Sequence, residues 1–260
     1  MSILSEFLLR TSVTQGGALP LIHTTTSYHL KKFQETNKLI ATECDVFKPD
    51  RLSYFFVGRP AYKYQGDGPE AEYWELPCCF VFEFEAVTNI TRVFPFDSGA
   101  FANRRYPSYI NRMDLSNFEV NSAPHAASRI IGAFFGDTRS YFHLKGKDGS
   151  TFEKEFHLEV FDAELKALHR LANEKLPASF DDRRFTIEMQ SSNDVDLTVT
   201  NPLAVIVPLP YFDNQNFLGH VQSTWKAVPI GYPMYTLSVS GYYYAIYERV
   251  EAFFKSRGIL

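Results

Sequence analysis

The sequence has little of what marks secreted, metal-binding or membrane proteins. Its 260 residues include three cysteines, Cys44, Cys78 and Cys79, without C-x-x-C spacing or a partnering histidine cluster. We therefore expect buried, reduced thiols and no metal site. No apolar run approaches the roughly eighteen residues of a membrane span. The N-terminus has an early acid and only a short apolar run, unlike a signal peptide. These absences predict a cytoplasmic protein with no membrane partner.

Excess positive charge is also missing. Lysine and arginine number 26 against 30 aspartates and glutamates, which gives a net charge of -4. Nonspecific nucleic-acid binding needs clustered cations, so only a local basic groove is compatible with this balance. The sequence also lacks G-x-G-x-x-G, a Walker loop, G-x-S-x-G and H-E-x-x-H, which excludes Rossmann, kinase and zincin functions.

Aromatic residues are abundant, with 24 Phe and 15 Tyr. This composition favours sheet structure and aromatic-lined pockets, and it predicts one α+β domain over residues 1–260. Strands are expected near 18–24, 39–44, 52–57, 78–84, 184–189 and 203–209, a hairpin at 140–144 and 151–158, and helices at about 162–176 and 242–256. Residues of about 95–126 show no sustained period and are interpreted as an inserted, loop-rich region.

The first candidate site lies in residues 54–64 (YFFVGRPAYKY), where an aromatic strand runs into Gly58, Arg59 and Pro60. Glycine would let a ligand approach the backbone, and proline would stiffen the exit. An arginine in this frame is suited to phosphate or carboxylate, because its planar fork donates two parallel hydrogen bonds. The alternative is a solvated surface arginine after a buried strand.

The second candidate site is Glu188, within residues 183–190 (RRFTIEMQ). Strand alternation places Glu188 on the same face as Thr186 and Gln190. A glutamate in the middle of such a strand is costly unless it is solvated, paired or used in chemistry. Pairing with Arg184 is the alternative to a catalytic role.

Three blocks resemble DarT-type DNA ADP-ribosyltransferase toxins. Residues 21–37 are similar to the family opening H-x-T-x-x-x-N-L-x-x-I-L-x-x-G, residues 55–64 to its aromatic strand with Arg, Pro and Tyr, and residues 186–190 to the strand with its catalytic glutamate. The blocks follow in the same order across roughly positions 18 to 210. The chain departs from the pattern at His29, Asn37 and Gly58, where the family prefers Asn, Gly and often Pro. The chain therefore resembles the broader ADP-ribosyltransferase-like group.

The resemblance implies a mixed or antiparallel split β-sheet core with flanking helices and NAD as a substrate. It implies that Glu188 bonds the ribose 2'-hydroxyl and stabilises an oxocarbenium-like transition state, with Arg59 as a second catalytic residue that grips pyrophosphate or positions the acceptor. The NAD-binding residues that it implies are His23, Thr24, Thr25, Tyr54, Arg59, Tyr62 and Tyr64.

The acceptor of ADP-ribose stays open. Thr186 stands two residues before Glu188, where transferases that modify arginine or Rho proteins carry Gln or Glu, so a guanidinium acceptor is not expected. A basic aromatic cluster indicates single-stranded DNA or RNA as the acceptor of ADP-ribose. The alternative interpretation of this cluster is a solvated loop. Capture by water would instead give an NAD glycohydrolase effector, and a noncatalytic NAD-like ligand-binding module is a third alternative. The resemblance also implies a toxin or anti-phage defence role with an antitoxin or defence-complex partner. The cluster comprises Arg104, Arg105, Tyr106, Tyr109 and Arg112.

Overall fold

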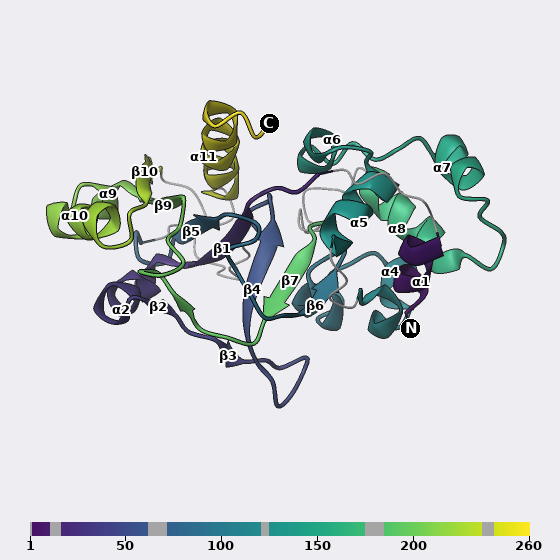
Figure 1. Ribbon diagram of the computed structural model, residues 1–260, viewed down its shortest axis with the longest axis horizontal. Coiled ribbons are helices and arrows are strands. Elements are labelled where there is room, and N and C mark those ends of the chain that lie inside the picture. The colour runs from purple at the N-terminus through teal and green to yellow at the C-terminus, as the bar shows by residue number, and fades with distance from the viewer. Residues whose placement is uncertain (1, 11–16, 62–71, 121–124, 175–184, 236–241) are drawn as a thin grey trace. The chain divides into compact units, whose positions relative to one another are not determined.

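The computed structural model describes residues 2–10, 17–61, 72–120, 125–174, 185–235 and 242–260 (Figure 1). It is a mixed α/β structure with strands in both orientations, which agrees with the expected α+β class. The chain forms two compact units, each built from several segments. Unit 1 comprises Met1–Ala18, Cys44–Lys48 and Ile90–Gln190, and unit 2 comprises Leu19–Glu43, Pro49–Asn89 and Ser191–Leu260. The expected single domain stays a prediction.

Unit 2 is built on a sheet with the strand order β10-β9-β5-β1-β4, and β3 pairs with β4. Neighbours are antiparallel except β9 and β10, which are parallel. Every residue of β5 and β9 is buried, as expected for apolar runs in the middle of a sheet. The strands are β1 (Leu21–Thr26), β3 (Thr42–Glu43), β4 (Arg51–Val57), β5 (Pro77–Phe82), β9 (Ala204–Pro208) and β10 (Val228–Tyr232).

A residue that departs from the toxin pattern explains part of the fold of unit 2. Helix α2 ends at Asn37, which adopts the left-handed conformation (φ 55°) that a family glycine would also favour. The Asn37 side chain adds what glycine lacks, because its Oδ1 accepts hydrogen bonds from His220 Nε2 and Trp225 Nε1, each at 2.8 Å. The other elements are η1 (Ser27–His29), α2 (Leu30–Thr36), β2 (Lys38–Leu39) paired with β8 (Val195–Asp196), α9 (Leu209–Phe212), α10 (Gln215–Ser223) and α11 (Tyr242–Ser256).

Unit 1 is mainly helical and also holds strands β6 and β7, which are neighbours in a sheet. Eight of the nine residues of α5 are buried, and a group of phenylalanines that includes Phe7, Phe134, Phe152 and Phe185 packs around this helix. The elements are α1 (Ile3–Arg10), β6 (Ile90–Phe94), α3 (Ser98–Ala102), α4 (Ser108–Asn111), η2 (Leu115–Phe118), α5 (Ala126–Phe134), α6 (Thr138–Phe142), α7 (Gly149–Glu155), α8 (Ala163–Asn173) and β7 (Glu188–Ser191).

The predicted hairpin at 140–144 and 151–158 is wrong, because both segments begin as helices. Asp137 accepts a hydrogen bond from Ser140 N, and Asp148 accepts one from Thr151 N, so each aspartate is the N-cap of a short helix. The sequence K-D-G-S thus starts helix α7 and does not turn a hairpin. Helix α8 and helix α11 lie where the sequence predicted helices.

The structure confirms that the three cysteines are free and buried. Within the described ranges, no helix is long and apolar enough to cross a bilayer. The described part of the chain also contains no group of three or more His, Cys, Asp or Glu side chains arranged to hold a metal ion.

Candidate functional site

Glu188 is the first residue of β7 and is only 1% exposed. Its carboxylate receives three hydrogen bonds: from Ser98 Oγ to Oε1 at 2.7 Å, from Ser98 N to Oε2 at 3.1 Å, and from Gln190 Nε2 to Oε1 at 2.6 Å. Strand alternation explains the contact with Gln190, because residues two apart in a strand share a face. The carboxylate is therefore fixed in orientation by donors from two segments of unit 1.

The surroundings of Glu188 destabilise its charge. The pKa of Glu188 is raised to about 8, chiefly by burial and also by the neighbouring Asp97, while the hydrogen bonds from Gln190 and Ser98 act in the opposite direction. A carboxyl with such a pKa exchanges its proton near neutral pH. This property is common among catalytic acids and bases and rare among structural carboxylates.

Sequence reasoning missed Asp97 and Ser98, which it treated as part of a loop-rich insertion. They come shortly after strand β6, and Asp97 is the N-cap of α3, where its Oδ1 accepts a hydrogen bond from Ala100 N at 2.7 Å. The signal was present in residues 95–99 (PFDSG), because an aspartate followed by serine and glycine after an aromatic strand is a typical helix start. The sequence gives no indication that this segment lies close to Glu188 in the folded protein.

Two polar atoms beside this carboxylate have no partner among the described residues. Thr186 Oγ1 and Gln190 Oε1 are both buried and unpaired. An unpaired buried polar atom costs roughly 1–3 kcal/mol, so such atoms are expected where a ligand or a proton completes the arrangement. Pairing of Glu188 with Arg184, the alternative from the sequence, falls outside the described residues.

His23 of β1 belongs to unit 2, where its ring packs near Phe55 and Phe80 at centroid distances of 5.6 and 6.5 Å. Its Nδ1 lies 2.9 Å from the carbonyl oxygen of Tyr54. A carbonyl can only accept, so Nδ1 carries the proton and Nε2 presents a lone pair. Burial lowers the pKa of His23, with the Tyr54 carbonyl opposing and His29 contributing. A neutral, partly exposed imidazole of this kind can accept a hydrogen bond from a hydroxyl.

The neighbouring residues of β1 point in alternate directions. Thr24 Oγ1 donates to the carbonyl oxygen of Ala61 at 2.7 Å, which ties β1 to the segment after Pro60. Thr25 shares the face of His23 by strand alternation and is partly exposed. Tyr54 is partly exposed on β4. Thr25 and Tyr54 therefore retain exposed surface for a ligand, whereas the hydroxyl proton of Thr24 is already used in the hydrogen bond to the Ala61 carbonyl.

Arg59 is neither at an open lip of the sheet nor on the surface, because it is 3% exposed. Its Nε donates to the hydroxyl of Tyr247 on α11, and its guanidinium carbon lies 5.4 Å from the centre of the Tyr247 ring. The interpretation of Arg59 as a solvated strand-end charge is therefore wrong. A ligand anion reaches this guanidinium only after the contact with Tyr247 is rearranged.

Gly58 also has a role other than the expected one. It adopts φ +65°, and a Cβ at this position would lie 2.4 Å from Leu19 Cδ1. Its N donates to the carbonyl oxygen of Pro20 at 2.8 Å. The close approach that requires glycine is thus made by Leu19, where the sequence suggested a ligand.

The basic aromatic cluster does not form the predicted stacking surface. Tyr106 is 4% exposed and packs against Phe96 at 5.2 Å. The Tyr109 hydroxyl donates to Glu174, and the guanidinium of Arg170 lies 4.1 Å from the centre of the Tyr109 ring. Both rings are engaged within unit 1, which leaves the exposed Arg104 and Arg112 with the partly exposed Arg105. Tyr62 and Tyr64, predicted to bind NAD, lie outside the described residues.

A scan of the chain against protein-family models finds no match, and a search of curated proteins finds no similar sequence. The link to ADP-ribosyltransferases therefore rests on the three collinear blocks and on the chemistry of the residues in them.

Proposed function

We propose that the protein is an NAD-dependent ADP-ribosyltransferase, a DarT-like toxin or anti-phage defence effector that transfers ADP-ribose to a nucleic acid or another macromolecule. The observation that carries the proposal is the Glu188 carboxylate, which is buried, held by Ser98 and Gln190 and raised in pKa to about 8. Glu188 stands where the resemblance implies the catalytic glutamate of the family.

The chemistry suits a single oriented carboxylate. The bond between ribose C1' and the nicotinamide nitrogen breaks with its electron pair going to nicotinamide, which leaves as a neutral molecule and needs no general acid. Positive charge develops on the ribose, and the ionised form of Glu188, which prevails above its pKa of about 8, stabilises this charge near the 2'-hydroxyl. The acceptor nucleophile then bonds to C1' and loses its proton.

Ser98 indicates how substrate would reach the buried carboxylate. Its hydroxyl donates to Glu188 Oε1 at 2.7 Å, the same type of hydrogen bond that a ribose 2'-hydroxyl would make. Exchange of one hydroxyl donor for another conserves the hydrogen bond to Oε1, whereas displacement of the five-residue helix α3 also breaks the bond from Ser98 N to Oε2. We infer that ribose replaces Ser98 on this carboxylate.

An NAD glycohydrolase is the second candidate function. The engagement of Tyr106 and Tyr109 inside unit 1 favours it, because the expected base-stacking residues are occupied. Water would then capture the ribosyl cation at C1' in place of a macromolecule.

The test is nicotinamide release from NAD by purified protein, alone and with single-stranded DNA, RNA or cell extract. We expect Glu188→Gln to reduce release about 100-fold or more, because it removes the carboxylate charge. Glu35→Gln, a change at an exposed glutamate of α2, is the matched control and should leave release unchanged. Release without acceptor indicates a glycohydrolase, and release with one acceptor indicates a transferase. No release under any condition, for both wild type and Glu188→Gln, contradicts the proposal.

A further inference from the structure

The segment between α7 and α8 of unit 1 carries an exposed apolar tip on a closed turn. Glu159 N donates to Asp162 Oδ2 at 2.6 Å, and Asp162 N donates to the carbonyl oxygen of Glu159 at 3.3 Å. The two residues between them, Val160 and Phe161, are 77% and 89% exposed. Leaving apolar side chains in water on a hydrogen-bonded turn is unfavourable, so such a tip marks an interaction site.

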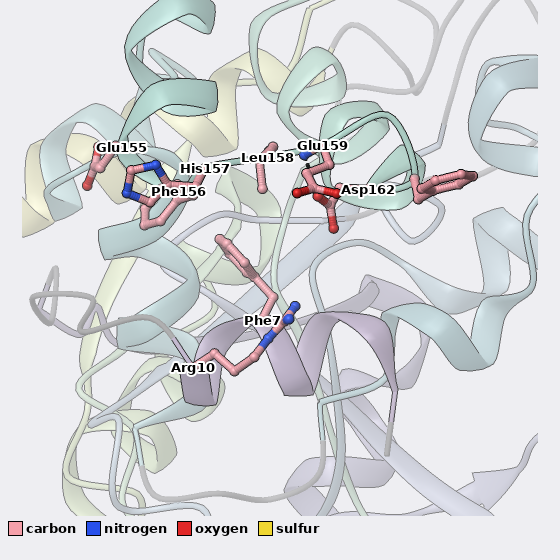
Figure 2. Close-up of a pocket in the computed structure, with 9 residues that line it drawn as sticks. Phe7, Arg10, Glu155, Phe156, His157, Leu158, Glu159 and Asp162 are labelled. Atoms are coloured by element: carbon pink, nitrogen blue, oxygen red, sulfur yellow. Dashed lines mark hydrogen bonds between the residues drawn. The ribbon is translucent and has the colours of Figure 1, made fainter.

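A cavity of about 710 Å³ lies beside this tip. Phe7, Phe156 and Leu158 supply its apolar walls, and Arg10, Glu159 and Asp162 supply charged ones. Figure 2 shows Phe7 and Arg10 extending from α1 toward the segment that carries Leu158, Glu159 and Asp162. Phe161 also lines the cavity, so a protruding apolar residue and a hollow with both polar and apolar lining belong to the same face.

The charges on this face are of both signs, and two of them, on Arg10 and Glu159, are uncommitted among the described residues. Within the described part of the chain, Arg10 makes no ion pair, and the Glu159 carboxylate makes no hydrogen bond. Glu155 is different, because Lys147 binds its carboxylate at 2.8 and 3.0 Å. A cation and an anion that line one cavity without pairing are available to groups from another molecule.

We propose that this face, comprising Phe7, Arg10, Phe156, Leu158 and the turn 159–162, is the interface of a symmetric homodimer. A two-fold interface uses the same patch on both copies, so it requires a surface that is complementary to itself. The tip of each copy enters the cavity of the other, where Phe161 packs on the partly exposed Phe156 and Leu158. Arg10 of each copy pairs with Glu159 of the other. A second copy fits this face better than another partner, because the protruding tip, the cavity, the cation and the anion all occur on the same face.

The first test is the molecular mass of the purified protein by sedimentation equilibrium between about 1 and 100 μM, the range in which weak dimers dissociate. We expect a concentration-dependent dimer. Val160→Ser and Phe161→Ser should each raise the dissociation constant at least about tenfold, since buried apolar anchors dominate interface energies. Val199→Ser is the matched control, because Val199 belongs to unit 2, is 80% exposed and is not one of the residues that line the cavity. It should leave the dissociation constant unchanged.

The second test exchanges the charges. Arg10→Glu should weaken the dimer by placing like charges opposite each other, and Glu159→Arg should do the same. The double variant Arg10→Glu/Glu159→Arg should restore it, which a loss of folding in either single variant would not explain. A wild-type protein that is monomeric throughout the range overturns the proposal, as does a dimer that tolerates Val160→Ser and Phe161→Ser. Failure of the double variant to recover also contradicts it, and circular dichroism verifies that each variant is folded.

Discussion

Unit 1 and unit 2 each bury a charged side chain, Glu188 and Arg59, and they compensate the charge in different ways. Glu188 receives three donors but lies near Asp97, and its charged form remains unfavourable. Arg59 receives the hydroxyl and the ring face of Tyr247, which both favour the cation. A buried charge that its surroundings satisfy serves the fold, whereas one that they oppose has a reason to be retained beyond stability. The comparison therefore supports the proposal that Glu188 is the reactive residue.

The largest expected effect concerns the stability of the protein against pH. The folded state holds the Glu188 proton up to about pH 8, whereas a free glutamate has a pKa of 4.5. The unfolded state ionises first, so the contribution of Glu188 to stability is full below pH 4.5 and is lost as the pH rises to about 8. Relative to wild type, Glu188→Gln should therefore gain on the order of a few kcal/mol between pH 5 and pH 9.

Urea denaturation of both proteins at several pH values measures this difference. Asp97→Asn should reduce the pH dependence while keeping the N-cap of α3, because it removes the neighbouring charge that raises the pKa of Glu188. Asp114→Asn, at an exposed position, is the control. If the free energies of unfolding of wild type and Glu188→Gln change with pH in the same way, Glu188 is ionised in the folded protein. The contrast with Arg59 would then disappear.

The next effect concerns the contact of Arg59 with α11. Tyr247→Phe removes the hydroxyl that accepts from Arg59 Nε and keeps the ring, and it should cost about 1.5–3 kcal/mol of unfolding free energy, as for hydrogen bonds to charged groups. Modification by an arginine-specific dicarbonyl, followed by peptide mass spectrometry, reports access to the guanidinium. Arg59 should react slowly in wild type and faster in Tyr247→Ala, with the exposed Arg104 as internal reference. Rapid modification of Arg59 in wild type would show that an anion reaches it without rearrangement.

A smaller effect tests the exchange of hydroxyls at Glu188. Ser98→Ala removes the donor to Oε1, so NAD should bind without displacing it and the KM should fall several-fold, equivalent to about 1 kcal/mol. Measurement of kcat and KM for nicotinamide release above pH 8.5, where Glu188 is ionised, separates this outcome from a positioning role. A fall in kcat at constant KM would mean that Ser98 orients the carboxylate during the reaction.

The smallest effect concerns β1. Thr24→Val removes the hydrogen bond to the Ala61 carbonyl and should cost about 1 kcal/mol, whereas Thr25→Val should change stability little. Thermal unfolding of the two variants makes the comparison. Equal losses would mean that Thr25 also serves the fold of unit 2 and is not reserved for a ligand.

Local patterns predicted most of the strands of unit 2 and several helices. β1, β4, β5 and β9 lie within a few residues of the predicted runs, because apolar and β-branched runs of this length are buried only as strands. The left-handed end of α2 at Asn37 was also predictable from the residue type. The 140–158 region was misread because aspartate, glycine and serine occur in both hairpin turns and helix N-caps.

The sequence by itself determined most strands of unit 2, helices α8 and α11, the three buried thiols and the strand face on which Glu188 lies next to Gln190, since these depend on side-chain types and on periodicity along the chain. Only the tertiary structure decided that Asp97 and Ser98, about ninety residues away, surround Glu188, that Tyr247 covers Arg59, and that Leu19 makes the contact which requires Gly58. These contacts join segments distant in sequence. Their chemistry depends on burial and on neighbouring charge, which no local pattern records.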